Sequence, residues 1–165
     1  MKNVLRSLFV CAMMFSVVSI AIAKEPADAL IDKYDGKKGF DVTIIGSDML
    51  NMMLQLPILP KEQKKMYEQT DEMVMVSYSG KNPTIESLYN EARGLFDSEG
   101  STYTYTQDIN QEGVVGKLFA IEEGETAKEI NVVINMGKSF MLIVMKGNYD
   151  RESLNEAQKP PKKMF

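Results

Sequence analysis

Four segments after Gly100 have the patterns of β-strands, and this run limits the fold more than any other feature. The segments are residues 102–106, 114–121, 130–136 and 140–145. Short connections that contain glycine join them. Such connections suit antiparallel neighbours, whereas parallel strands need a crossover of about a dozen residues or more. The run therefore predicts an antiparallel meander of four strands.

The first part of the chain combines helical and strand patterns. Residues 26–36 place apolar side chains three or four positions apart, begin with proline and end with glycine, which predicts a helix. Residues 40–44 alternate with a period of two and predict a strand. Ser47 then caps a methionine-rich helix that runs to Leu54.

A second strand and helix follow. Residues 73–78 predict the strand, and Asn82 caps a helix that begins at Pro83 and carries an apolar stripe. The polar residues 61–71 predict a surface connection or an exposed helical turn. Asp150 caps a last short helix.

This order predicts an α+β fold, a two-layer sandwich with a mostly antiparallel sheet. A β-α-β-α segment precedes the four-strand meander, and the helices are expected mainly on one face of the sheet.

The N-terminus has the three parts of a secretory signal peptide. Lys2 and Arg6 are its only charges, an apolar stretch covers residues 8–22, and Ala21 and Ala23 form a small-residue cleavage site. We expect cleavage after Ala23, a single α+β domain over residues 24–158 and a flexible basic tail over residues 159–165. An uncleaved anchor is the alternative, but the stretch is short for a membrane span. Cys11 is interpreted as an apolar filler rather than a lipidated cysteine.

Cleavage would leave a chain without histidine, cysteine or tryptophan. Such a chain forms no disulfide, no His/Cys zinc site and no catalytic triad that uses histidine as its base. It would carry 17 basic and 23 acidic residues, a net charge of −6. Nucleic-acid binding needs a basic face, and none is visible. No membrane span is expected after cleavage.

Three residue patterns have a chemical alternative to a structural role. Glu122, Glu123, Glu125 and Glu129 surround Gly124, where a solvated turn is expected; paired carboxylates could also hydrolyse a glycoside. Clustered methionines could bind Cu(I), but they also fill irregular cores.

Tyr103 and Tyr105 form the third pattern, because they could form a platform for a glycan or peptide or could fill cross-strand pairs. No catalytic, metal-binding or cofactor-binding residue is assigned.

The segment at residues 140–145 is apolar on both faces whatever its register. Such a strand is either central with both of its faces covered, or it exposes one apolar face. Met141, Ile143 and Met145 share one face and are the candidate partner-binding residues.

Two stretches carry a family resemblance: residues 42–50, VTIIGSDML, and residues 144–154, VMKGNYDRESL. They resemble the domain-of-unknown-function family numbered 4252. The resemblance implies an exported protein of bacteria with a two-membrane envelope, an α+β fold and no established activity.

The sequence thus predicts a periplasmic, non-enzymatic domain that binds another envelope protein or associates with itself through a sheet face. A carboxylate-based glycan hydrolase and a glycan- or lipid-binding module are the alternatives.

Overall fold

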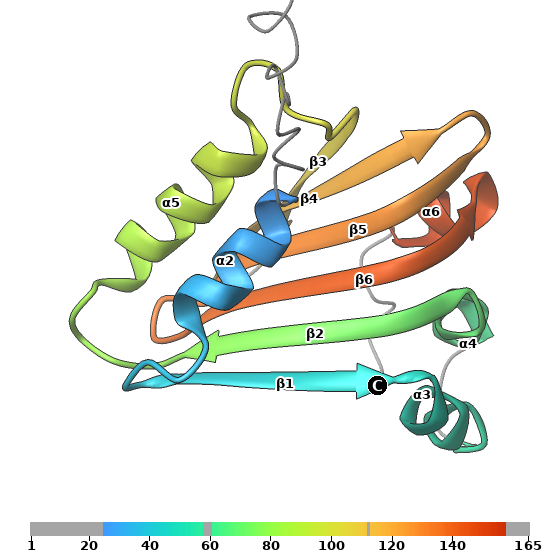
Figure 1. Cartoon of the computed structure of the whole chain (residues 1–165), viewed down its shortest axis with the longest axis horizontal. Coiled ribbons are helices and arrows are strands. Elements are labelled where there is room, and N and C mark those ends of the chain that lie inside the picture. Colours follow the sequence, from blue (N-terminus) through green and yellow to red (C-terminus); the bar gives the residue numbers. More distant parts are fainter. Residues whose placement is uncertain (1–24, 58–60, 112, 158–165) are drawn as a thin grey trace, which may run out of the picture.

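Six antiparallel strands form one sheet in the order β1-β2-β6-β5-β4-β3 (Figure 1). The computed structural model describes residues 25–57, 61–111 and 113–157. The strands are β1 (Phe40–Gly46), β2 (Thr70–Tyr78), β3 (Tyr105–Gln111), β4 (Val114–Glu123), β5 (Thr126–Asn135) and β6 (Phe140–Asp150). Strands β3 to β6 form the predicted meander. Strand β2 pairs with β6, so the last strand of the meander becomes central and β1 becomes an edge.

The helices fall into two groups. They are α2 (Pro26–Tyr34), α3 (Ser47–Leu54), α4 (Lys61–Glu68), α5 (Ile85–Phe96) and α6 (Arg151–Ala157). Helices α2 and α5 lie across the face of the sheet that Figure 1 shows, which is called the front face below. The short helices α3, α4 and α6 gather at the end of the sheet where β1 and β6 finish. The α+β fold with an antiparallel sheet is as predicted.

Alternation along each strand produces two separate cores, because successive side chains of a strand point to opposite faces. The front core includes Val76, Leu142 and Phe119, packed under α2 and α5. The core on the opposite face, called the back face, includes Met73, Met145 and Ile130 together with residues of α3, α4 and α6. Both faces of β6 therefore contribute to a core.

Aromatic side chains fasten the front core at both ends. Tyr34 of α2 stacks on Phe40 with ring centroids 4.5 Å apart. At the other end Phe96 of α5 packs edge-on against Tyr103, with centroids 4.9 Å apart. The sheet is thus fixed from its front side over nearly its whole width.

The caps of two helices differ from the prediction. Ser47 is the first helical residue of α3, Gly46 occupies the cap position, and no side chain caps that end. The cap of α5 is Thr84, whose hydroxyl accepts a 3.2 Å bond from the amide of Ser87, so the predicted Asn82 cap is wrong. Asp150 does cap α6, because its carboxylate accepts a 2.8 Å bond from the amide of Ser153.

Two strand boundaries also differ. Strand β3 begins at Tyr105 rather than at Thr102, and it runs five residues beyond the predicted end. Strand β2 begins at Thr70, directly after α4. The exposed helical turn expected in that region is a complete helix. No helix among the described residues is long and apolar enough to cross a membrane.

Candidate functional site

The back face carries a row of apolar side chains that no core fully covers. The pairing of neighbouring strands places these side chains in two lines that cross the sheet from β1 to β3. The first line runs Thr43, Met75, Ile143, Val132, Leu118 and Gln107. The second runs Asp41, Ser77, Met141, Ile134, Gly116 and Ile109. We call the six partly exposed apolar members the open strip: Met75, Met141, Ile143, Val132, Ile134 and Ile109.

The open strip is continuous across the sheet. A Cβ at position 116 would lie 2.9 Å from the carbonyl oxygen of Val133, 3.4 Å from Ile109 Cβ and 3.5 Å from Ile134 Cγ1. The two isoleucines therefore lie close to the glycine from both neighbouring strands. Asp41, at the outer edge, is the single charged residue in the two lines. The strip is an apolar and uncharged surface in the middle of the sheet.

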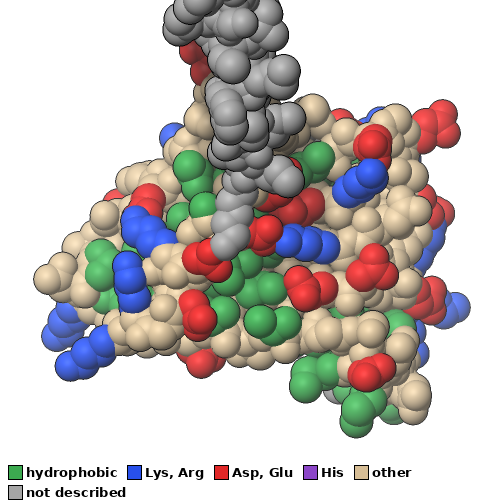
Figure 2. All heavy atoms as spheres, viewed as in Figure 1, with side chains coloured by type: hydrophobic (Ala, Val, Ile, Leu, Met, Phe, Trp, Pro, Cys, Tyr) green, Lys and Arg blue, Asp and Glu red, His purple; other side chains and the backbone are tan. Residues whose placement is uncertain are grey.

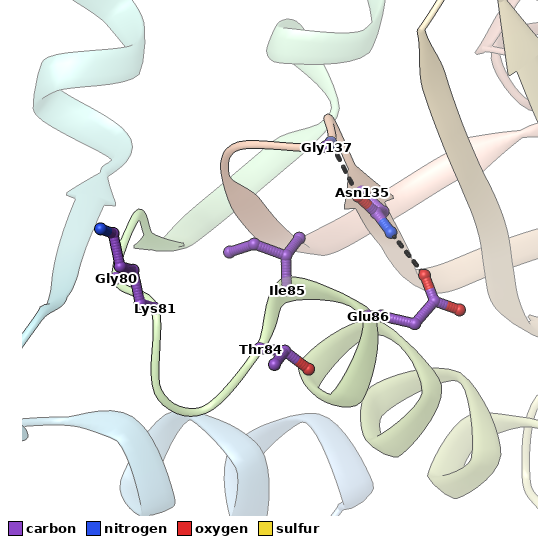
Figure 3. A pocket seen from close by; sticks show the side chains of 7 residues that line it. All are labelled: Gly80, Lys81, Thr84, Ile85, Glu86, Asn135 and Gly137. Carbon is purple, nitrogen blue, oxygen red and sulfur yellow. Dashed lines mark hydrogen bonds between the residues drawn. The ribbon is translucent and has the colours of Figure 1, made fainter.

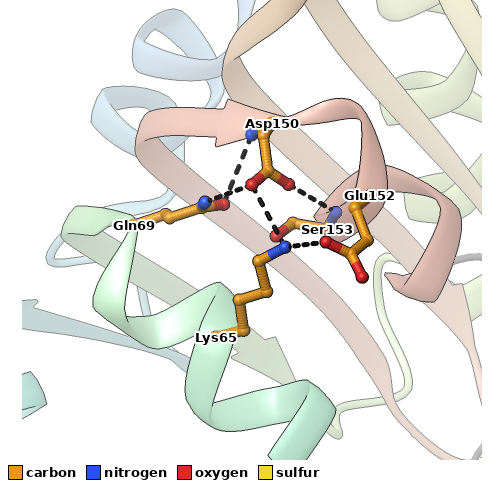
Figure 4. A network of polar contacts seen from close by, with 5 residues as sticks. All are labelled: Lys65, Gln69, Asp150, Glu152 and Ser153. Carbon is orange, nitrogen blue, oxygen red and sulfur yellow. Dashed lines mark hydrogen bonds and ion pairs between the residues drawn. The ribbon is translucent and has the colours of Figure 1, made fainter.

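The short helices border the strip at one end. They sit over the next line of the back face, where Met73, Met145 and Ile130 are buried. A polar network holds this border together (Figure 4): Lys65 of α4 pairs with Asp150 at 3.1 Å and also with Glu152 of α6. One end of the open strip is thus bordered by α3, α4 and α6.

Asp150 is the centre of that network. It accepts the amide hydrogen of Ser153 and a 3.0 Å bond from Gln69 Nε2. These bonds, with the ion pair to Lys65, hold the pKa of Asp150 well below its usual range. The carboxylate is therefore charged at neutral pH and ties α4 to α6.

The structure separates the three partner-binding candidates of the sequence. Met141 and Ile143 lie in the open strip, partly exposed. Met145 lies on the same face but is only 6% exposed, because α3, α4 and α6 pack over that end. Met75, Val132, Ile134 and Ile109 were missed. Their alternation was visible in the sequence, but the register that unites them was not.

The structure describes the side chain of one of the two tyrosines in the predicted platform, Tyr103. Tyr103 precedes β3 and is 8% exposed, with its ring against Phe96 and Phe119. The side chain of Tyr105 lies outside the described residues. Tyr103 thus contributes to the front core.

A buried carboxylate explains the position of Tyr103. Glu129 of β5 is 5% exposed, and its Oε1 accepts bonds from the Tyr103 hydroxyl at 2.7 Å and from Asn131 Nδ2 at 2.6 Å. Burial, followed by the nearby charge of Glu129, raises the pKa of Tyr103 far above its ordinary value. Tyr103 therefore stays protonated and donates to the carboxylate.

Lys146 balances part of the charge in this region. It faces Glu129 in the ladder and forms a 2.6 Å ion pair with Asp28 of α2. Burial disfavours the charged lysine, but the hydrogen bond and charge of Asp28 outweigh it and raise the pKa of Lys146. Figure 2 shows acidic and basic side chains intermixed in the centre of the front side of the molecule. The arrangement neutralises a buried acid.

The other predicted acids lie in or beside a turn. Gly124, with φ of +65°, connects β4 to β5, and Glu123 and Glu125 flank it in solvent. Glu122 pairs with Arg151. Within the described residues no three acidic side chains converge as a metal site would require.

A hollow of about 410 Å³ lies at the start of α5 (Figure 3). Its lining residues are Gly80, Lys81, Thr84, Ile85, Glu86, Asn135 and Gly137. Asn135 donates to Glu86 at 3.0 Å and accepts from the amide of Gly137 at 2.8 Å. The side chain of Asn135 thus has both of its partners within the lining of the hollow.

These features define an α+β domain with one sheet face covered over its centre by two helices and one partly open, uncharged sheet face. The family model described as "Domain of unknown function (DUF4252)" matches residues 34–157, and the chain belongs to this family. No curated protein and no solved structure matches it.

Proposed function

We propose that this chain is a non-enzymatic domain of the bacterial envelope that binds another envelope protein through the open strip. The observation that carries the proposal is the asymmetry of the central strands. Leu142 and Val144 are 0% exposed on the front face, while Met141 and Ile143 remain partly exposed on the back. Contiguous apolar surface of this kind on a soluble domain marks an interaction site.

The strip is held in place before any partner arrives. Its strands are fixed from the front by α2 and α5 and bordered by the salt-bridged helices α4 and α6. A surface that is already ordered loses little conformational entropy on binding, which favours affinity.

The dimensions of the strip favour a single helix as the bound element. Two side-chain lines about 7 Å apart, crossing five strands spaced about 4.8 Å, give a surface of roughly 14 Å by 24 Å. A helix is about 10 to 12 Å across and covers about 24 Å in 16 residues. The absence of charge in the strip favours a helix with a neutral apolar stripe.

The alternatives have less support. A glycan hydrolase needs two carboxylates facing a cleft. Glu129 is instead used by Tyr103 and Asn131, and Glu122 pairs with Arg151. A glycan platform would need an exposed Tyr103 ring, but that ring is buried in the front core. The envelope location rests on the sequence pattern of residues 1–23, which lie outside the described residues, and osmotic-shock fractionation of producing cells tests it.

Site-specific photo-crosslinking in cells tests the binding surface. A benzophenone amino acid at Ile143 is expected to give a discrete protein adduct. The matched control is the same probe at Asn90, an exposed residue of α5 on the front side. Ile143→Lys should reduce recovery of that adduct partner in a pull-down, because it places a charge in the apolar strip.

Equal adducts from Ile143 and Asn90, or none from Ile143, would contradict the proposal. A saccharide that co-purifies in place of a protein would favour the glycan-binding alternative.

A further inference from the structure

Strand β1 is an edge strand that contains no lysine, no proline and no bulge. One side of it pairs with β2 in unbroken register, and the other side is the margin of the sheet. Natural edge strands are commonly blocked by lysine, proline or a bulge, because exposed backbone groups invite pairing with another chain. The sequence of β1, FDVTIIG, contains none of these three, and Asp41 is its single charged residue. The opposite edge, β3, is the more polar YTQDINQ.

Exposed apolar side chains concentrate beside β1. Ile44 at its end is 63% exposed, and Met49, Met52 and Leu56 in and after α3 are 52%, 70% and 45% exposed. These four are most of the large apolar side chains that are exposed among the described residues; the other two are Leu95 and Val115. Figure 2 shows the apolar group at the lower right, over the α3 end of β1. The edge strand β1 and an apolar cluster thus occupy the same margin of the sheet.

The charges at the two ends of β1 are opposite. Lys37 and Lys38 precede the strand, and Asp48 follows it. At the same end as Asp48, Glu72 of β2 pairs with Gly46 in the ladder. Figure 2 shows basic side chains at the lower left, toward the start of β1. None of the ion pairs between described residues uses Lys38 or Asp48.

We infer that two copies of this chain pair antiparallel through β1, which joins their sheets into one. Antiparallel pairing of identical strands brings the basic end of one copy to the acidic end of the other. With the two-fold axis at Thr43, the paired strands run from Phe40 to Gly46, and Ile44 faces Val42 of the second copy. Beyond their ends, Lys38 in the turn before β1 of one copy lies near Asp48 in the first turn of α3 of the other. Pairs of β-branched residues stabilise antiparallel neighbours, opposite charges near the ends add attraction, and the contact would cover Ile44. This dimer uses a different surface from the open strip and does not depend on the proposed function.

A symmetric disulfide tests the register. Residues directly opposite in an antiparallel pair have Cα atoms about 4.5 to 5.5 Å apart, within the range that a disulfide spans. Thr43→Cys, made in a Cys11→Ser background so that it is the single thiol, should form a covalent dimer under mild oxidation. Thr106→Cys on the opposite edge strand is the matched control and should react far more slowly.

Sedimentation of the protein purified from cells expressing the full chain tests the energetics. Lys38→Glu or Asp48→Lys should each weaken the dimer about tenfold in Kd. Each change brings like charges near each other, and the two-fold symmetry repeats that repulsion at both ends of the contact. The double variant should restore the dimer, which a merely structural effect would not do. Ile44→Lys should give monomers with an unchanged circular dichroism spectrum, while Val115→Lys should remain dimeric.

A protein that stays monomeric across the concentration range, with Thr43→Cys no faster than Thr106→Cys, would overturn the inference. A dimer that crosslinks through Ile143→Cys but not through Thr43→Cys would overturn it too, since the sheet face would then be the contact.

Discussion

Tyr103 donates a 2.7 Å hydrogen bond to Oε1 of Glu129, a carboxylate that is 95% buried inside a strand. The residues are 26 positions apart: Tyr103 precedes β3, Glu129 lies in β5, and β4 lies between these two strands in the sheet. Asn131 donates to the same oxygen. A buried charge is costly unless it is hydrogen-bonded, so the pair turns a destabilising residue into a fixed part of the core.

Removal of this hydroxyl should destabilise the protein. Tyr103→Phe leaves the ring packing intact but takes one donor from Glu129, which should lower the free energy of unfolding by about 1 to 3 kcal/mol. Urea denaturation measures the change. Tyr89→Phe, at a buried position of α5, is the control and should cost less; equal losses would argue against the assigned role of the pair.

Acid should weaken the contact between α4 and α6. The pKa of Asp150 is depressed in the folded state, so its stabilising effect is complete above the unfolded pKa of about 3.9 and is lost as the pH falls toward the folded value. Asp150→Asn should therefore lose stability at neutral pH and show a smaller further loss in acid. Urea midpoints at a series of pH values test this. Asp108→Asn, an exposed position in β3, should keep the wild-type pH profile.

Gly147 should resist substitution more than a glycine that turns the chain. A Cβ at this position would lie 2.0 Å from the carbonyl oxygen of Gln69, at the irregular pairing of β2 with β6. Because that atom is backbone, Gly147→Ala should cost at least about 3 kcal/mol or prevent folding. Gly137→Ala meets no atom within 4 Å and is strained only by its φ of +75°, so about 1 kcal/mol is expected. Thermal unfolding ranks the two, and the reverse order would refute the steric argument.

Two consecutive residues of β6 should respond differently to the same change. Leu142→Ala opens a cavity in the front core and should cost about 2 to 5 kcal/mol. Ile143→Ala changes a partly exposed side chain and should cost distinctly less stability while it weakens partner capture. Unfolding and pull-down measurements on both variants separate folding from binding. Similar stability losses would mean that the back face is as closed as the front.

The sequence predicted the meander because its strands are neighbours along the chain and short glycine turns connect them. It also predicted that residues 140–145 are apolar on both faces. The caps at Ser47 and Asn82 were predicted wrongly because several adjacent residues can begin a helix, and the tertiary fold decided which one does. Glu129 was grouped with the acids of the turn, since nothing local distinguishes a buried glutamate from a solvated one.

The sequence by itself determined the alternation of the strands and the family. It also determined that a chain cleaved after Ala23 would have no histidine, cysteine or tryptophan. The tertiary structure alone decided that β2 pairs with β6, that β1 becomes an edge and that Met145 is covered while Ile143 is not. The physical reason is the range of the interactions. Periodicity and turns depend on residues a few positions apart, whereas strand order and coverage depend on contacts between segments far apart in the chain, and no local pattern records them.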